Sequence, residues 1–190
     1  MKNIRPISLT ILIFSIALIG SYYIYYHFIN LRQESIVTTY EKENIYNAKN
    51  TNYINNKDNE SNVLGILSIS KINLKLPFYD KSSKKNNVNK NIEILKESSM
   101  PDKKGGTIIL AAHSGNSYLG YFKKLFILNK EDEIQIKYKN KEYTYIVDKI
   151  YELPKNGQIE INKNINENVL VLTTCSSNSK QLVITSKLLS

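Results

Sequence analysis

Two reactive side chains each follow an apolar run of the chain. His113 ends the run in 109-ILAAHSGNSYLGYF-122, and Cys175 ends the run in 168-NVLVLTTCSSNSKQLVITSKL-188. An imidazolium beside a thiol lowers the pKa of the thiol and provides a thiolate nucleophile near neutral pH. The same imidazole can then protonate a leaving amine. The two residues are therefore a candidate nucleophile and acid–base pair.

Cys175 is the single cysteine of the chain, and its type alone leaves three interpretations. An unpaired cysteine in a domain outside the cell is a buried inert side chain, an intermolecular link or a reactive thiol. A core cysteine more often lies inside an apolar run, whereas Cys175 follows VLVLTT and precedes the polar SSNS. This placement at the start of a polar turn favours the reactive thiol.

Short strand-like segments must position the pair. They are rich in β-branched and aromatic residues or alternate with a period of two, which predicts a mostly antiparallel sheet, closed or folded on itself. If the two strands that end in His113 and Cys175 are neighbours, the side chains meet. The predicted strands are 63–69, 72–79, 107–112, 133–138, 142–153, 168–174 and 181–188, and short helices are predicted at 88–98 and 118–126.

Length and composition indicate one folded domain. The chain has 190 residues, of which 42% are hydrophobic and 23% charged, as in an ordinary globular protein. The formal net charge is +9, but the lysines are scattered and are not interleaved with aromatic residues. A nucleic-acid partner is therefore not expected, and a solvated surface is the favoured explanation. Attraction to anionic lipid headgroups or to an anionic wall polymer is the alternative.

The N-terminal segment predicts a membrane anchor. From Ile7 to Ile29 the chain has no charged residue, and this run is longer than the roughly 20 residues that cross a bilayer as a helix. A cleaved signal peptide is the rival interpretation. The length of the run, the lack of an A-x-A-like site and the cluster 22-YYIYY-26 favour an uncleaved anchor. Basic residues before the run place the N-terminus in the cytoplasm and the rest of the chain outside.

The chain therefore divides into four parts. Residues 1–6 form a cytoplasmic N-terminus and 7–29 a single transmembrane helix. Residues 30–62 form a polar spacer, whose first part can continue the helix and whose end is too polar to order itself. Residues 63–190 form the catalytic domain.

The catalytic segments, taken in order, resemble the sortase family of Gram-positive cysteine transpeptidases. The resemblance covers nearly everything from Val63 onward and includes an A-A-H context, a T-T-C strand and an anchor in the expected place. The segments that carry it are 64-LGILSISKINLKLPFY-79, 105-GGTIILAAHSGNSYLGYFKKL-125, 142-EYTYIVDKIYELP-154 and 170-LVLTTCSSNSKQLVITSKL-188.

This resemblance implies a fold and a reaction. The fold is a sortase-like closed antiparallel β-barrel of about eight strands with one or two short helices, in which His113 and Cys175 lie at one end of a substrate groove. A sorting signal of the Leu-Pro-x-Thr-Gly kind is cleaved after Thr and held as a Cys175 thioester, with His113 as the acid and base. Surface proteins that carry such a signal are the expected substrates, and a peptidoglycan precursor of the cell wall or a pilin amine is the acceptor. No metal or organic cofactor is required.

The chain departs from the family at one position. Sortases have an Arg on the last strand, where a fixed cationic donor stabilises the oxyanion or positions the peptide. Arg5 and Arg32, both in or next to the membrane segment, are the only arginines here. Alignment of the last strand places Gln181 at the Arg position, one residue after Lys180. Lysine provides charge without a forked geometry, and glutamine provides a hydrogen bond without charge.

Other polar residues are weaker candidates. Ser114 and Thr174 are candidate groove residues because each is adjacent in sequence to His113 or Cys175. Two carboxylates amid lysines, Glu160 and Glu167, make a poor calcium site, since that ion takes about six to eight oxygens. Three residues are candidates for orienting His113, and the sequence does not select among them: Asp80, Asp102 and Asp148.

Three hypotheses follow. The first is an active sortase, and the second is a degenerate sortase-like barrel that binds peptides or partners without turnover because the Arg is absent. The third is a redox protein that uses Cys175 in intermolecular disulfides. Cleavage of a peptide with hydroxylamine as acceptor distinguishes the first two, and reducible dimers would indicate the third.

Overall fold

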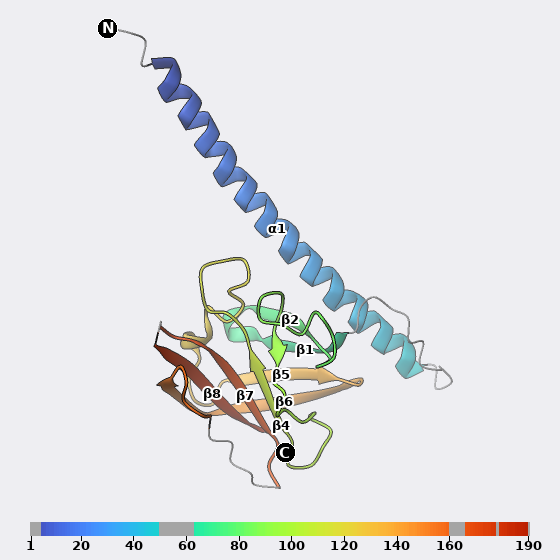
Figure 1. Cartoon of the computed structure of the whole chain (residues 1–190). Helices are drawn as coiled ribbons and strands as arrows, with labels where there is room; N and C mark the ends of the chain where they lie inside the picture. The colour runs from blue at the N-terminus through green and yellow to red at the C-terminus, as the bar shows by residue number, and fades with distance from the viewer. Residues whose placement is uncertain (1–4, 50–62, 160–165, 178, 190) are drawn as a thin grey trace.

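The chain forms one long N-terminal helix and a barrel-like β-sheet (Figure 1). The structure is a computed structural model, and it describes residues 5–49, 63–159, 166–177 and 179–189. Side chains within the helix are described for residues 9–43. The helix, α1 (Arg5–Lys49), lies along one side of the sheet domain and extends well beyond it toward the N-terminus.

Eight strands of the described chain form a single sheet in the order β2-β1-β5-β6-β8-β7-β4-β3. All neighbouring strands are antiparallel except β4 and β7, which are parallel. A bridge between Phe78 and Ile92 links the two ends of the sheet, so the barrel is nearly closed. The strands are β1 (Val63–Ile69), β2 (Leu74–Tyr79), β3 (Glu93–Ile94), β4 (Thr107–Ala111), β5 (Glu133–Tyr138), β6 (Lys141–Pro154), β7 (Val169–Cys175) and β8 (Lys180–Leu188).

The barrel interior holds the main apolar core. Alternate residues of β7, Leu170 and Leu172, are fully buried inside it together with Ile184 of β8. The next residues along β7, Val169 and Val171, belong to a second buried cluster on the outer face of the sheet. Because β7 is covered on both faces, its sequence is a continuous apolar run with no alternation. The sequence prediction of a mostly β, sortase-like barrel of about eight strands is confirmed.

The two predicted helices are wrong. Residues 88–98 form turns and the short strand β3, because Ile92 and Ile94 are needed in the barrel core. The Asn86 side chain donates to the Ile94 carbonyl at 3.1 Å and accepts from the Ile94 amide at 2.7 Å, so it occupies backbone groups that a helix would use. Residues 118–126 form turns that lead into a single 3₁₀ turn, η2 (Leu125–Ile127). A second 3₁₀ turn, η1 (Ser70–Ile72), precedes β2.

The C-terminal half of α1 packs on the barrel. Val37 is buried against the domain, and the Tyr40 hydroxyl donates to the Leu64 carbonyl at 3.2 Å. Glu41 forms ion pairs with Lys75 at 2.9 Å and with Lys137 at 3.7 Å, which tie the helix to β2 and β5. These contacts fix the direction in which the helix leaves the domain.

The part of α1 that precedes Tyr22 extends away from the barrel with its large apolar side chains exposed, from Leu9 to Ile19. Within the described residues, Leu9–Glu43 contains a stretch long and apolar enough to cross a membrane, with a mean hydropathy of 1.7. Its length and composition fit a membrane span or a signal anchor. The predicted boundaries of the anchor and spacer stay predictions, and residues 50–62 lie outside the described residues.

Candidate active site

The parallel pair of β4 and β7 brings the ends of two apolar runs to the same edge of the sheet. Ala111 lies opposite Thr173 in this pair. Continuing the register by two residues places His113 opposite Cys175. Ile109 of β4 and Val171 of β7 pack together on the outer face of the sheet, and Cys175 follows Val171 on that face of β7. The structure therefore places the backbone segments that carry His113 and Cys175 side by side.

Hydrogen bonds hold the segment around His113 against the end of β7. The Thr174 hydroxyl donates to the Ala112 carbonyl at 2.7 Å, and the Ala112 amide donates to the Thr173 carbonyl at 3.4 Å. On the other side of the histidine, the Ser114 hydroxyl donates to the Cys175 carbonyl. His113 is thus flanked by two residues that are each bonded to β7.

Thr174 was a candidate groove residue, but its side chain is buried on the interior face, opposite to that of Cys175. Thr174→Val should lower the free energy of unfolding by about 1–3 kcal/mol, because it leaves the buried Ala112 carbonyl without its partner. Thermal or urea unfolding measures this change. Thr174→Ser retains the hydroxyl and is the matched control. Equal stability of the valine and serine variants would contradict a structural role for this hydrogen bond.

Cys175 is exposed and unpaired, and His113 is half-buried. The Nε2 atom of His113 lies 3.1 Å from Oδ1 of Asn89, in the turn that precedes β3. This contact joins the imidazole of His113 to the turn before β3. Sequence reasoning missed Asn89, since the segment 86–91 contains several asparagines and no pattern distinguishes one of them.

The three aspartates that were candidates for orienting His113 have other partners. Asp80 accepts from Ser82 within its own turn, from the amide at 2.9 Å and the hydroxyl at 2.6 Å, and these bonds lower its pKa. Asp102 pairs with Lys139 at 3.0 Å, and Asp148 lies 3.8 Å from Lys187. Asn89 is therefore the side chain that the structure places on the imidazole.

Gln181 lies directly across from Cys175 in the pairing of β7 with β8. Its Nε2 donates to the Pro154 carbonyl at 3.2 Å and to the Gly157 carbonyl at 2.9 Å. Its Oε1 accepts from the Thr173 hydroxyl at 3.3 Å. The amide thus connects the end of β6 to β7 and shares the outer face with Cys175.

Lys180 lies on the opposite face of β8. Its ammonium group forms an exposed ion pair with Glu152 at 3.1 Å. The pKa of the Glu152 carboxyl is lowered most by a hydrogen bond from the Ser176 side chain and next by the one from Lys180. Of the two candidate replacements for the family Arg, Gln181 has the orientation toward Cys175, and Lys180 has the charge.

Comparison with known proteins identifies the family. A family model described as the sortase domain matches residues 67–189. The chain belongs to the sortase family. No curated protein matches it by sequence. Membership supports a sortase-type cysteine transpeptidase, and surface proteins or pilins as the class of substrate.

Solved sortase structures share the fold. Sortase C1 from Streptococcus agalactiae is 27% identical and covers 70% of each chain, with a TM-score of 0.57. Sortase C of Streptococcus pneumoniae, whose description refers to pilin substrate specificity, is 22% identical, covers 70% of this chain and 69% of that one, and has a TM-score of 0.62. A Clostridium perfringens sortase D5 transpeptidase is 18% identical, covers 83% of this chain and 98% of its own, and has a TM-score of 0.64.

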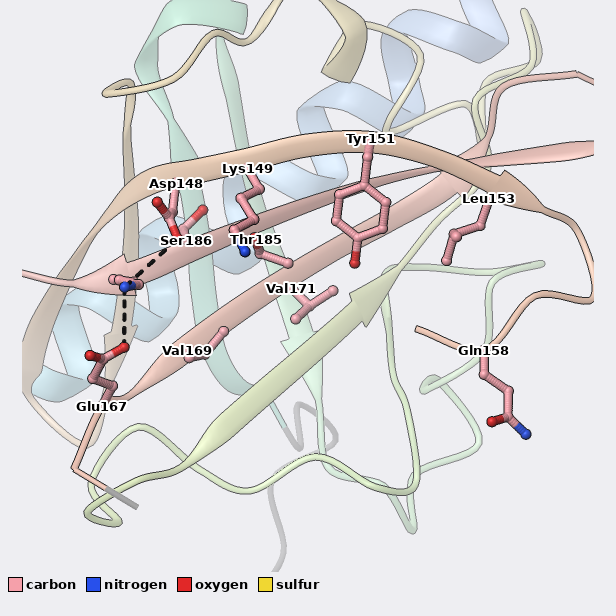
Figure 2. Close-up of a pocket in the computed structure, with 11 residues that line it drawn as sticks. Asp148, Lys149, Tyr151, Leu153, Gln158, Glu167, Val169, Val171, Thr185 and Ser186 are labelled. Atoms are coloured by element: carbon pink, nitrogen blue, oxygen red, sulfur yellow. Dashed lines mark ion pairs between the residues drawn. The ribbon is translucent and has the colours of Figure 1, made fainter. Parts of the chain in front are cut away.

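This sortase has a cavity of about 610 Å³ on the outer face of the sheet. Figure 2 shows Tyr151 and Leu153 of β6 directed toward the same space as Val169 and Val171 of β7. The two valines precede Cys175 on the same face of β7, since they alternate with interior residues. The apolar surface of the cavity therefore leads along β7 toward the thiol.

The charged residues of this cavity lie at the end remote from Cys175. Lys187 pairs with Glu167 at 3.3 Å and lies 3.8 Å from Asp148 (Figure 2). Glu167 was one of the two carboxylates weighed as calcium ligands, and it is engaged with this lysine. Glu160, the other, lies outside the described residues. Among the residues described, no group of three or more His, Cys, Asp or Glu side chains is placed to hold a metal ion.

Proposed function

We propose that this sortase is a membrane-anchored transpeptidase that cleaves a Leu-Pro-x-Thr-Gly-like sorting signal through a thioester on Cys175. The acyl group passes to an amine of the cell wall or of a pilin. The observation that carries the proposal is the attachment of the His113 segment to β7 on both sides of the histidine. Those bonds support a fixed approach of the imidazole to the thiol.

The proposed transpeptidation has two steps. The Cys175 thiolate attacks the carbonyl carbon of the scissile peptide bond, and His113 donates its proton to the departing amine as the C–N bond breaks. The resulting thioester is attacked by the acceptor amine, whose proton passes to His113. The C–S bond then breaks and the thiolate is restored. The proton that His113 gives to the leaving amine in the first step is returned by the acceptor amine in the second.

The outer face of β7 offers a place for the peptide. An extended chain can lie beside β7 with its apolar residue against Tyr151, Leu153 and Val171, which line the cavity, and its scissile bond at Cys175. Thr173 shares this face with Cys175 whereas Thr174 faces the interior, and both threonine side chains are buried. The Ser114 hydroxyl donates to the backbone carbonyl of Cys175.

The helix supports an anchored enzyme. We propose that residues 7–29 span the membrane once, with the N-terminus in the cytoplasm and the barrel outside the cell, since basic residues precede the apolar run. Such a topology places the thiol in the compartment of the surface proteins and the cell wall. The reaction uses protein side chains alone, so no cofactor is part of the proposal.

Trapping of the acyl-enzyme tests this function. The full chain in detergent is mixed with a set of sorting-signal peptides, and the mass of the fragment that contains Cys175 is measured. The expected result is a mass increase equal to the N-terminal part of one peptide, which hydroxylamine removes. Absence of a hydroxylamine-labile adduct with every peptide would reject the proposal.

A binding-only barrel is the second candidate, and the engagement of Gln181 favours it. The amide is used in contacts with Pro154, Gly157 and Thr173, so no positive charge faces the thiol from this position. In that case a sorting peptide binds with a measurable Kd but is not cleaved. Calorimetry beside the trapping experiment distinguishes the two functions.

Asn89 is a positioning residue under this proposal, because its side chain contacts the imidazole of His113. Asn89→Ala should lower kcat about tenfold, or about 1.4 kcal/mol, with KM nearly unchanged, since the histidine loses its orientation while the groove stays intact. Steady-state kinetics with a fluorogenic peptide measure the split. Asn89→Asp keeps an acceptor oxygen in the same place and should restore most of kcat. A rise in KM alone, or no rescue by aspartate, would contradict this role.

A further inference from the structure

The loop that follows His113 runs along the helix and not away from it. The Tyr22 hydroxyl lies 3.5 Å from the Asn116 carbonyl, and the rings of Tyr25 and Tyr118 meet edge to face at 5.2 Å. Farther along the helix, the Gln33 amide donates to the Tyr121 hydroxyl at 3.3 Å. The loop therefore contacts the helix from the level of Tyr22 to that of Gln33.

The first of these contacts lie at the depth of the membrane surface if the helix spans the bilayer. The cluster 22-YYIYY-26 lies near the end of the apolar run, where tyrosines mark the headgroup region. The ammonium group of Lys123 lies 5.6 Å from the ring centroid of Tyr26. Because a helix rises about 1.5 Å per residue, Tyr22 and Tyr26 differ in depth by only about 6 Å. The parts of the barrel that contact these tyrosines therefore also lie in the headgroup region.

The segment around Lys123 has the composition of a protein surface that enters the headgroup region of a membrane. Phe126 and Ile127 of η2 are 74% and 40% exposed, although Leu125 between them and the lysines is buried. Lys123 and Lys124 precede the apolar pair and are separated from it by Leu125 alone. A protein exposes adjacent large apolar side chains at a cost unless a partner covers them, and flanking lysines suit an anionic partner.

We propose that Tyr118, Lys123, Lys124, Phe126 and Ile127 form an interfacial surface that rests on the anionic phospholipid headgroups of the membrane in which α1 is anchored. Phe126 and Ile127 enter the boundary between headgroups and acyl chains, and the two lysines contact lipid phosphates. The charge agrees with this partner, since the chain has a net charge of +9. This inference rests on the proposed membrane span of α1.

The interfacial surface has a consequence for the reaction. It lies on the same loop as His113, and the Phe122 amide between them donates to the His113 carbonyl at 2.9 Å. Contact with lipid through this loop holds the His113 and Cys175 end of the barrel toward the membrane. Figure 1 shows that this loop lies on the side of the barrel from which the N-terminal half of the helix extends. The site is therefore oriented to accept peptide bonds that lie close to the bilayer.

A single introduced tryptophan tests the surface, because the chain has none. The full-length Phe126→Trp variant is reconstituted in vesicles of anionic phosphatidylglycerol whose lipids carry brominated acyl chains. The expected result is a loss of about half of the tryptophan emission and a blue shift, since interfacial residues enter the membrane by about 5–10 Å. Leu189→Trp is the matched control. Leu189 is also exposed, at 59%, but follows β8 at its far end from Cys175, and it should not be quenched.

Phe14→Trp, within the apolar half of α1, reports on the span itself. If Phe14→Trp is strongly quenched but Phe126→Trp is quenched no more than Leu189→Trp, the interfacial surface is overturned. The membrane anchor would still stand in that case. No quenching of Phe14→Trp would overturn the anchor and this inference with it. Replacement of the anionic lipid by a zwitterionic one should weaken the Phe126→Trp signal. An unchanged signal would overturn the role given to Lys123 and Lys124.

Discussion

Cys175→Ala and His113→Ala should each abolish transpeptidation, with losses on the order of 10⁴-fold or more in kcat. Without the thiol no thioester forms. Without the imidazole, the leaving amine receives no proton and the thiol has no cationic partner. Because the two side chains act as one unit, the double variant should be no worse than either single variant.

Hydroxylamine-dependent release of a labelled peptide measures this loss, and thermal unfolding shows whether the barrel is intact. Folding should change little, because Cys175 is exposed and the His113 side chain is only half-buried. Ser177→Ala, in the exposed turn after Cys175, is the matched control and should retain activity. Full turnover by either catalytic variant would remove that residue from the proposed mechanism.

The barrel could be predicted from the sequence because its strands are locally encoded. Each predicted strand has its own alternation or apolar run, and β1 and β5 coincide with the predicted ranges 63–69 and 133–138. The position of His113 and Cys175 at two strand ends was equally visible. In the sheet β4 and β7 are parallel neighbours, so the ends of both runs lie at one edge, and the joint role of the two side chains stays a prediction.

The features that could not be predicted depend on contacts between distant segments. The segment 88–98 has helical spacing of apolar residues, but Ile92 and Ile94 pack in the barrel and Asn86 binds the backbone of Ile94. Asn89 contacts His113 only after that segment folds into turns. No periodicity in one chain encodes such a pairing.

The hydrogen bonds of Gln181 could not be predicted for the same reason. Alignment places a glutamine where sortases have arginine, but the sequence does not show what its amide contacts. Its partners are the Pro154 and Gly157 carbonyls of another strand end, and the Thr173 hydroxyl. The structure thus shows which contacts a replacement at position 181 would have to keep. A residue that replaces Gln181 must keep the Gly157 carbonyl paired and provide a donor near the thiol, since the Pro154 carbonyl also accepts from the Gly157 amide at 2.7 Å.

Gln181→Arg should raise kcat/KM by about tenfold to a thousandfold, or about 1.4 to 4 kcal/mol. A guanidinium has five N–H donors, so it can donate to the Pro154 and Gly157 carbonyls and retain donors for an oxyanion at Cys175. The Thr173 hydroxyl loses the Gln181 oxygen but keeps the Leu182 carbonyl at 3.2 Å. The added charge also lies on the face of β8 that Cys175 shares.

Two further variants separate geometry from charge, with kcat/KM on the same sorting peptide as the measurement. Gln181→Lys adds the positive charge without the planar, forked set of guanidinium donors and should give a smaller gain in kcat/KM. Lys180→Arg provides a fork on the opposite face, beside Glu152, and should give none. Equal gains from arginine at 180 and 181 would indicate a general effect of charge and contradict the oxyanion role. If Gln181→Arg forms an acyl-enzyme with peptides that the parent only binds, the parent is the binding-only barrel, and the missing arginine is what prevents turnover.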